Sequence, residues 1–278
     1  MSIVTFWGSG EEQVGKTLAV VAVATTMAIE HNKRILVISA SYNNNTLKKC
    51  YWNDAVTKKN SMFAPSKGVE LDSGMEGLAK IVQSGKINPN SITDYTRVVF
   101  KDRLEVLLGF GKETLLTNED VGKIYSDIVQ AAGQYYDIVL VDLDNEINQV
   151  SANEILKNSN LVVTMATQKM SSINAVRKNS EILPANQKML LIGRYDRRSK
   201  YTLKNLARTL GEKTELKAIP YSTLYFEAAE EGVVTDLFLK LRRIEDKNDV
   251  NYFFIEHVKR ATQEITKRMQ DDKLMRMR

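Results

Sequence analysis

Short apolar runs alternate with stretches of helical periodicity along the 278-residue chain. The runs predict strands at Ile3–Trp7, Arg34–Ile38, Arg97–Phe100 or Leu104–Phe110, Asp137–Leu143, Leu161–Ala166, Met189–Ile192 and Leu216–Ile219. The periodic stretches predict helices at Lys16–His31, Gly74–Val82, Glu119–Tyr135, Ser171–Leu183, Leu203–Leu210, Tyr225–Glu231 and Tyr252–Met269. This alternation predicts an α/β fold: a single domain with a mostly parallel twisted sheet and helices on both faces.

Two polar stretches interrupt this pattern and are expected to be surface loops. Ser39–Asn60 is rich in asparagine, and Ser84–Thr96 contains Pro89 among Gly, Asn and Ser. Residues 1–245 are expected to form one domain. Residues 246–278 are expected to form a C-terminal helix and basic tail packed on it.

The most specific motif follows the first predicted strand. Residues 10–17 read Gly10-Glu11-Glu12-Gln13-Val14-Gly15-Lys16-Thr17, which satisfies G-x-x-x-x-G-K-[ST] at the start of a helix. Glycines permit a loop whose amides point at phosphate oxygens, and the helix N-terminus adds partial positive charge. We therefore predict a nucleotide site over residues 10–18, ending at Leu18. The alternative is an ordinary glycine turn with a solvated Lys16.

Within this site, Lys16 is expected to contact the β- and γ-phosphates and Thr17 to ligate Mg²⁺. The strand Asp137–Leu143 supports this, because Asp142 lies near its end, where a carboxylate can hold the metal's water shell. Lys16 and Asp142 are the candidate catalytic residues. Asp144 and Glu146 are further acids that either position the attacking water or face solvent.

These features resemble the MinD/ParA group of deviant P-loop ATPases. The resemblance also rests on two later runs, 189–196 and 218–222, and it extends from Ser2 to about Leu241. It implies that Mg²⁺ and ATP are bound, with ATP sandwiched in a homodimer that positions cargo, DNA or a membrane-bound partner. It further implies that Gly193, Arg194 and Pro220 border the adenine.

The sequence departs from that family at two places. Glu11 stands where the family carries an extra lysine that crosses the dimer interface, and Glu12 and Gln13 replace usual glycines. Ser39 and Ser41 stand where the family has an Asp-x-Asp arrangement that orients the hydrolytic water. Because serine is no general base at neutral pH, we expect ATP hydrolysis to be slow or absent. Within the family, the modified loop looks most like the TadZ/CpaE proteins that place pilus-assembly machinery.

Composition adds a modest constraint. The formal charge of +5 favours acidic surfaces, and basic residues cluster at 197–200, at 240–243 and along the last helix, where they either bind DNA or are simply solvated. The tail from Lys273 to Arg278 resembles in a general way the membrane-targeting tail of MinD. A lone cysteine, Cys50, and the absence of a leader before the first strand favour the cytoplasm. The resemblance adds a cell pole or the periphery of the inner membrane as alternatives within it.

The leading hypothesis is therefore an Mg²⁺-ATP-binding switch protein that dimerises and recruits or positions partner proteins, in pilus or secretion assembly. A second is a ParA-type DNA-partitioning ATPase that binds nucleoid DNA through its basic C-terminal face. A third is a pseudo-ATPase scaffold that binds nucleotide weakly or not at all.

Overall fold

The computed structural model of the chain describes residues 2–8, 13–41, 45–52, 74–110, 116–145, 147, 149–180, 187–211 and 216–276. The strands are β1 (Ser2–Gly8), β2 (Ile35–Ala40), β3 (Arg97–Phe100), β4 (Leu104–Leu107), β5 (Ile138–Leu143), β6 (Leu161–Ala166), β7 (Lys188–Tyr195) and β8 (Lys217–Pro220). The helices are α1 (Lys16–Glu30), α2 (Asn45–Tyr51), α4 (Met75–Gln83), α5 (Asn118–Tyr135), α6 (Gln149–Lys157), α7 (Met170–Ser180), α8 (Leu203–Leu210), α9 (Thr223–Glu231), α10 (Val234–Leu241) and α11 (Tyr252–Arg276), with the 3-10 helix η1 at Pro89–Tyr95.

The described strands form one sheet in the order β3-β4-β2-β5-β1-β6-β7-β8. Every neighbouring pair is parallel except β3 and β4, which confirms the predicted fold class. The chain builds one side of the sheet from β1 through β5 and then crosses to β6 on the other side. The carboxyl end of β1 therefore lies where the strand order reverses, the place where α/β sheets bind ligands.

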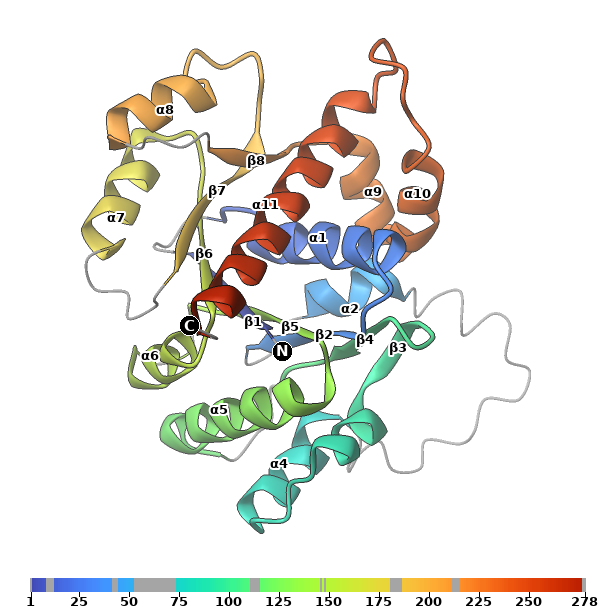
Figure 1. Cartoon of the computed structure of the whole chain (residues 1–278), viewed down its shortest axis with the longest axis vertical. Coiled ribbons are helices and arrows are strands. Elements are labelled where there is room, and N and C mark those ends of the chain that lie inside the picture. The colour runs from blue at the N-terminus through green and yellow to red at the C-terminus, as the bar shows by residue number, and fades with distance from the viewer. Residues whose placement is uncertain are drawn as a thin grey trace.

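Helices cover both faces of the sheet (Figure 1). One face packs against α1, α2, α9, α10 and α11, and the other against α4, α5 and α6. Alternate residues of the central strands enter opposite cores: Ile35 and Val37 of β2 face the α1 side, whereas Leu36 and Ile38 face the α5 side. A smaller core joins α7 and α8 to β6, β7 and β8.

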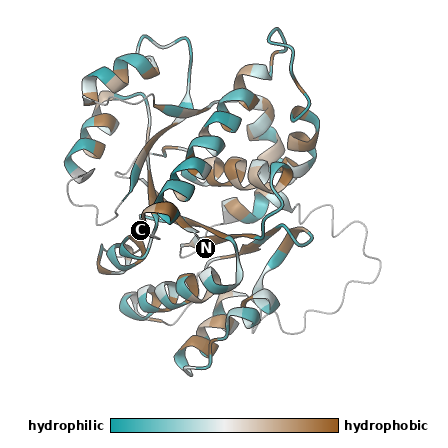
Figure 2. Ribbon diagram, in the orientation of Figure 1, coloured by the Kyte–Doolittle hydropathy of each residue, from teal (hydrophilic) through white to brown (hydrophobic). Residues whose placement is uncertain are grey.

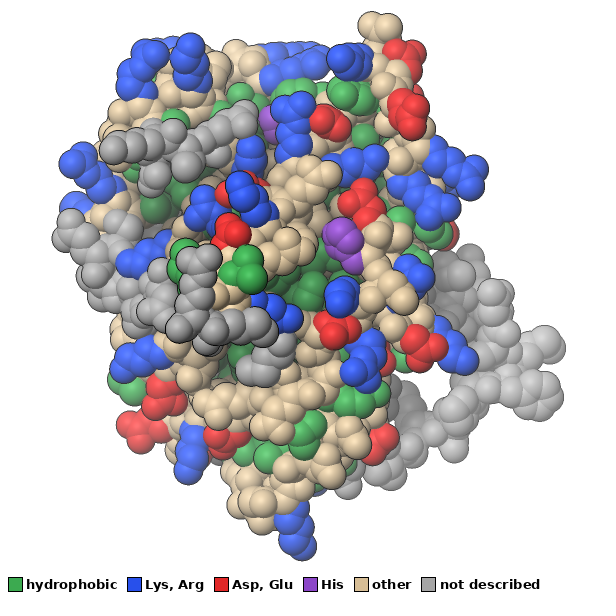
Figure 3. Space-filling model, in the orientation of Figure 1, with side chains coloured by type: hydrophobic (Ala, Val, Ile, Leu, Met, Phe, Trp, Pro, Cys, Tyr) green, Lys and Arg blue, Asp and Glu red, His purple; other side chains and the backbone are tan. Residues whose placement is uncertain are grey.

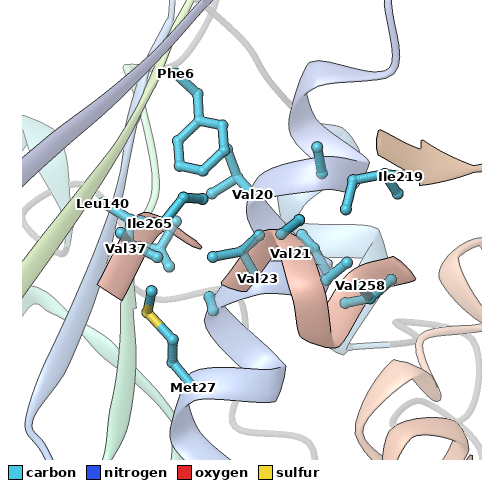
Figure 4. Close-up of a cluster of buried hydrophobic side chains, with 14 of the residues drawn as sticks. Phe6, Val20, Val21, Val23, Met27, Val37, Leu140, Ile219, Val258 and Ile265 are labelled. Carbon is cyan, nitrogen blue, oxygen red and sulfur yellow. The ribbon is translucent and has the colours of Figure 1, made fainter. Parts of the chain in front are cut away.

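Helix α1 is buried along almost its whole length. All ten residues from Ala19 to Ala28 are buried, and the helix is apolar on nearly every side in Figure 2. Its valines and Met27 lie between Phe6, Val37 and Leu140 of the sheet and Val258 and Ile265 of α11 (Figure 4). This packing fixes the position of the first turn of α1, which carries the nucleotide motif.

The C-terminal helix α11 lies along α1 and β8. It continues seven residues past the predicted end at Met269, to Arg276, so most of the basic tail is helical. Asp272 is buried in its last turns and accepts a hydrogen bond from Asn160, whose own Oδ1 accepts from the Ile3 amide. No helix within the described ranges is long and apolar enough to cross a membrane.

The structure corrects several local predictions. Both alternatives for the third strand form, as the antiparallel pair β3 and β4, with Asp102 at φ 61° in the turn between them. The two predicted loops contain helices: α2 forms within Ser39–Asn60, and η1 forms within Ser84–Thr96, where Asn88 caps it. Their polar composition concealed short helices, because capping side chains and one buried face are sufficient to hold a helix in place.

Helices α6 and α10 were not predicted. Each is short, and each buries a stripe spaced by three or four residues, such as Val234, Leu237, Phe238 and Leu241 of α10. The sequence of α10 therefore contains the apolar spacing that predicts a helix.

Helices α5 and α6 pack so closely that glycine is needed between them, which gives a stability prediction. A Cβ at Gly122 would overlap the Ser151 side chain and approach the Ser151 Cα to 2.9 Å. Gly122→Ala should therefore lower the free energy of unfolding by about 1–3 kcal/mol, despite alanine's better helix propensity, as measured by urea denaturation.

The double variant Gly122→Ala/Ser151→Gly is the matched control, because it removes the overlapping side chain. It should recover much of the loss. A single Gly122→Ala variant as stable as the original chain would contradict this packing.

Candidate functional site

The phosphate-loop motif lies at the carboxyl end of β1, as the sequence indicates. Gly15 caps the N-terminus of α1 with φ 74°, a left-handed conformation that glycine adopts without strain. The Gly15 carbonyl accepts the first helical bond, from the Ala19 amide at 3.0 Å, so the preceding amides of the first turn have no partner within α1. Gly10, Glu11 and Glu12 lie outside the described residues.

Lys16 and Asp142 meet at this edge of the sheet. The Lys16 Nζ lies 3.2 Å from Asp142 Oδ1 and also donates to the Leu143 carbonyl. The Asp142 side chain is fully buried and that of Lys16 is 14% exposed, so the ammonium lies at the mouth of a site with a buried carboxylate behind it. A buried carboxylate requires such pairing, because desolvation of an unpaired charge is costly.

Thr17 completes this group. Its Oγ1 donates to Asp142 Oδ2 at 2.7 Å, so a hydroxyl and a carboxylate, both hard oxygen donors, converge on one point. Mg²⁺ prefers such donors and usually keeps waters and phosphate oxygens for its other positions. No group of three or more His, Cys, Asp or Glu in the described part of the chain could hold a metal alone. The donor set therefore fits a metal that arrives with a nucleotide.

The end of β2 is neutral and closed by hydrogen bonds. Ser39 Oγ lies 2.9 Å from Ser41 Oγ, and both residues are buried. The Tyr125 hydroxyl, from α5, accepts from the Ser41 amide at 3.1 Å and lies 3.0 and 2.9 Å from the Ser39 and Ser41 carbonyls. A Cβ at Gly109 would come within 2.5 Å of the Ser41 carbonyl oxygen, so the chain after β4 packs closely against this segment.

The carboxyl end of β7 contacts the phosphate loop from the other side. A Cβ on Gly193 would overlap the Val14 carbonyl oxygen, so this close approach requires glycine. Arg194 follows with φ 51°, which is uncommon for a residue with a side chain. Its Cγ lies 3.1 Å from where a Cβ on Gly15 would stand, and its Nη1 donates to the Gln13 carbonyl at 3.4 Å.

A cavity of about 870 Å³ opens beside Arg194, at the ends of β7 and β8. Its walls combine charged and aromatic groups, with Arg197 stacked 5.1 Å above the Phe253 ring. The rest of the lining includes Tyr221, Ser222, Leu224 and Val250. Its size and mixed lining suit a small organic ligand.

Pro220 directly precedes the segment from Tyr221 to Leu224 that lines the cavity. It pairs with Tyr195 in the sheet, so it positions the segment that forms the wall.

A further hydrogen bond joins helix α9 to the first turn of α1. The Tyr225 hydroxyl, on α9, donates to the Leu18 carbonyl of α1 at 2.6 Å. Burial raises the pKa of Tyr225 well above its usual value, so the hydroxyl stays protonated and the bond persists across physiological pH. The segment after Pro220 is thus held against the first turn of α1.

The structure therefore brings together the predicted residues Gln13, Val14, Gly15, Lys16, Thr17 and Leu18 with Asp142 and Arg194. Ser41 lies at the neighbouring strand end, where β2 pairs with β5 and Ser39 is level with Asp142. Sequence patterns did not identify Tyr125 or Gly109, because neither belongs to a motif and each acts through a contact distant in the sequence.

The sequence matches no protein-family model, and a search of curated proteins finds no match. Solved structures do match. The ParA family ATPase from Chlorobium tepidum TLS superposes with a TM-score of 0.65 at 13% identity, covering 92% of this chain and 97% of that one. The septum site-determining protein MinD of Pyrococcus horikoshii OT3, complexed with Mg-ADP, gives 0.63 at 14% identity over 96% and 98%.

A putative plasmid partition protein of Borrelia burgdorferi B31, bound to AMPPNP, gives 0.58 at 16% identity over 99% of both chains. At these identities the likeness establishes a shared fold over nearly the full length.

The Tyr125 contacts make a testable prediction about the end of β2. Tyr125→Phe removes a buried hydroxyl and leaves the Ser41 amide without its acceptor, so the free energy of unfolding should fall by about 1–3 kcal/mol in urea denaturation. Tyr135→Phe on the same helix is the control, since its hydroxyl bonds to no group in the described part of the chain. Equal stability of the two variants would contradict the role of Tyr125.

Proposed function

We propose that this chain is an Mg²⁺-ATP-binding switch protein whose nucleotide-dependent homodimer recruits or positions partner proteins. The observation that carries the proposal is the convergence of Lys16, Thr17 and Asp142 at the carboxyl end of β1, next to the N-terminus of a buried helix. Structural relatives in complex with Mg-ADP and with AMPPNP support the choice of ligand.

In this proposal the phosphates lie against the amides of residues 13–17, and the base occupies the cavity beside Arg194. Lys16 would contact the β- and γ-phosphates, and Thr17 and Asp142 would hold Mg²⁺. The metal would supply charge neutralisation of the phosphate oxygens. The buried charge of Asp142 would be compensated by Lys16 without ligand and by the metal with it.

The same geometry favours binding over hydrolysis. Ser39 and Ser41 carry no charge, and their hydroxyls and backbone are already engaged with each other and with Tyr125. General-base catalysis needs a group that accepts a proton near neutral pH, which serine does not supply. We therefore infer slow or absent hydrolysis, with the bound nucleotide acting as the signal. A role in pilus or secretion assembly, as in TadZ/CpaE proteins, remains a prediction from the resemblance.

Lys16→Ala tests this assignment. The variant should lose Mg²⁺-ATP binding in calorimetry, because the loop keeps its amides but loses the cation that faces the phosphates. In light scattering, Mg²⁺-ATP should double the mass of the original chain and leave that of Lys16→Ala unchanged.

Lys123→Ala, an exposed lysine of α5, is the matched control and should behave as the original chain does. Undiminished ATP affinity in Lys16→Ala would reject the site. Absence of ATP binding by the original chain would favour the scaffold hypothesis.

A second candidate function, duplex DNA binding, is supported by the distribution of charge. The described residues between 167 and 211 carry ten exposed Lys or Arg and one acid, Asp196, a formal charge of +9 within a chain of +5. They gather along α7, α8 and the turn after β7, where blue side chains follow the edge of the molecule in Figure 3. By contrast, α11 alternates its charges, with Glu256–Arg260 and Glu264–Arg268 pairs.

This basic surface, rather than the C-terminal helix, is the better candidate for phosphate contacts. Among the described residues of this basic surface, Tyr201 is the large apolar side chain that is exposed. The surface therefore offers little apolar area that could insert into lipid. Nucleic acid suits such a surface because its phosphates are contacted mainly through charge.

Lys204→Ala/Arg208→Ala on α8 tests DNA binding without touching the cavity. If the surface binds DNA, ATP-dependent binding to a fluorescent duplex of mixed sequence should weaken, and the slope of log affinity against log salt should become shallower by about two. Lys240→Ala/Arg243→Ala at the end of α10 is the control and should change neither. No duplex binding at low salt, or equal losses in both double variants, would exclude this surface.

A further inference from the structure

Arg194 is placed to serve the phosphates rather than the base. Its side chain runs along the phosphate loop: the Cγ packs over Gly15 and the guanidinium donates to the Gln13 carbonyl. The side chain is exposed, and the hydrogen bond at 3.4 Å is long. A cation held loosely against the loop can move to a stronger acceptor when one arrives.

The charges of the site show why a second cation is needed. Lys16 and Mg²⁺ would together bring three positive charges to the site, and the Asp142 carboxylate, 3.2 Å from the Lys16 Nζ, offsets one of them. The sequence adds two negative charges to the motif, at Glu11 and Glu12. A triphosphate is strongly anionic, and one Mg²⁺ neutralises only part of its charge. Lys16 contacts Asp142, while Arg194 packs over Gly15 and bonds to the Gln13 carbonyl, so both cationic side chains lie at this loop.

The backbone at Arg194 supports a functional placement. A φ of 51° costs energy for any residue with a Cβ, and residues in such conformations cluster at ligand-binding sites. The preceding Gly193 allows β7 to approach Val14, and that approach brings Arg194 over the loop. A close glycine contact and a residue in the left-handed conformation, in succession, thus direct one guanidinium at the loop.

We infer that Arg194 is a phosphate-binding residue of this site, supplying in cis a second positive charge to the nucleotide's phosphate chain. The inference rests on the proposed Mg²⁺-ATP function. On binding, the guanidinium leaves the Gln13 carbonyl and contacts a phosphate oxygen beside Gly15. Guanidinium suits this role because it is always charged and presents several donors in one plane.

Four variants test this role: Arg194→Ala, Arg194→Gln, Arg194→Lys and, as control, Lys200→Ala. Lys200 is an exposed basic residue of the turn after β7 that does not line the cavity. Alanine, glutamine and lysine keep the same left-handed backbone cost as arginine, so thermal unfolding should change little. Affinity is measured for Mg²⁺-ATP by calorimetry, and for Mg²⁺-tripolyphosphate, which has no base, by competition with a fluorescent ATP analogue.

A phosphate role predicts that Arg194→Ala and Arg194→Gln weaken both Mg²⁺-ATP and Mg²⁺-tripolyphosphate by about tenfold or more, the loss expected for one charge-assisted contact. Arg194→Lys should recover part of the loss, because it restores the charge. Lys200→Ala should leave the affinity for both ligands unchanged.

Two results would overturn the inference: unchanged affinity for both ligands, or a loss for Mg²⁺-ATP without a loss for tripolyphosphate, which would assign Arg194 to the base. Failure of the original chain to bind Mg²⁺-ATP would instead reject the proposed function, and this inference with it.

Discussion

The burial of α1 is the constraint on which the rest of the structure depends. A helix with ten consecutive buried residues has no polar face, so it must be enclosed by the sheet on one side and by α11, α10 and α2 on the other. Each buried valine or methionine contributes about 1.5–3 kcal/mol, so α1 cannot shift without a large loss of stability. Its first turn is therefore held rigidly, and Lys16 and Thr17 meet Asp142 without any adjustment of the helix.

Around this fixed turn, neighbouring strand ends differ sharply in chemistry. β5 ends in a buried carboxylate paired with a cation, whereas β2, its hydrogen-bonded neighbour, ends in serines whose polar groups are satisfied by one another and by Tyr125. Oxygen donors for a metal are thus present on one strand, and a charged base is missing from the other. Such a site is better suited to holding a ligand than to activating water.

The parts that sequence predicted correctly are those encoded locally. Gly15, Lys16 and Thr17 form a contiguous motif, and the strand that carries Asp142 follows from four apolar residues in a row, so fold class and motif position were both accessible. Tyr125 was not, because it reaches Ser39 and Ser41 across more than eighty residues. Gly193 was placed near the base by resemblance alone. Its close approach to the Val14 carbonyl depends on how far β7 extends, and the apolar run ended three residues before the carboxyl end of that strand.

Arg194 links three features that are separate in sequence. It touches the phosphate loop, it borders the cavity, and it precedes the turn whose arginines begin the basic surface along α7 and α8. Since β7 pairs with a strand on each side, β6 and β8, and Gly193 packs directly on Val14, little backbone movement is available at this point. A change in the loop would therefore be transmitted through the Arg194 side chain and the following turn rather than through the sheet. This arrangement gives the phosphate loop a short, direct connection to the basic surface along α7 and α8.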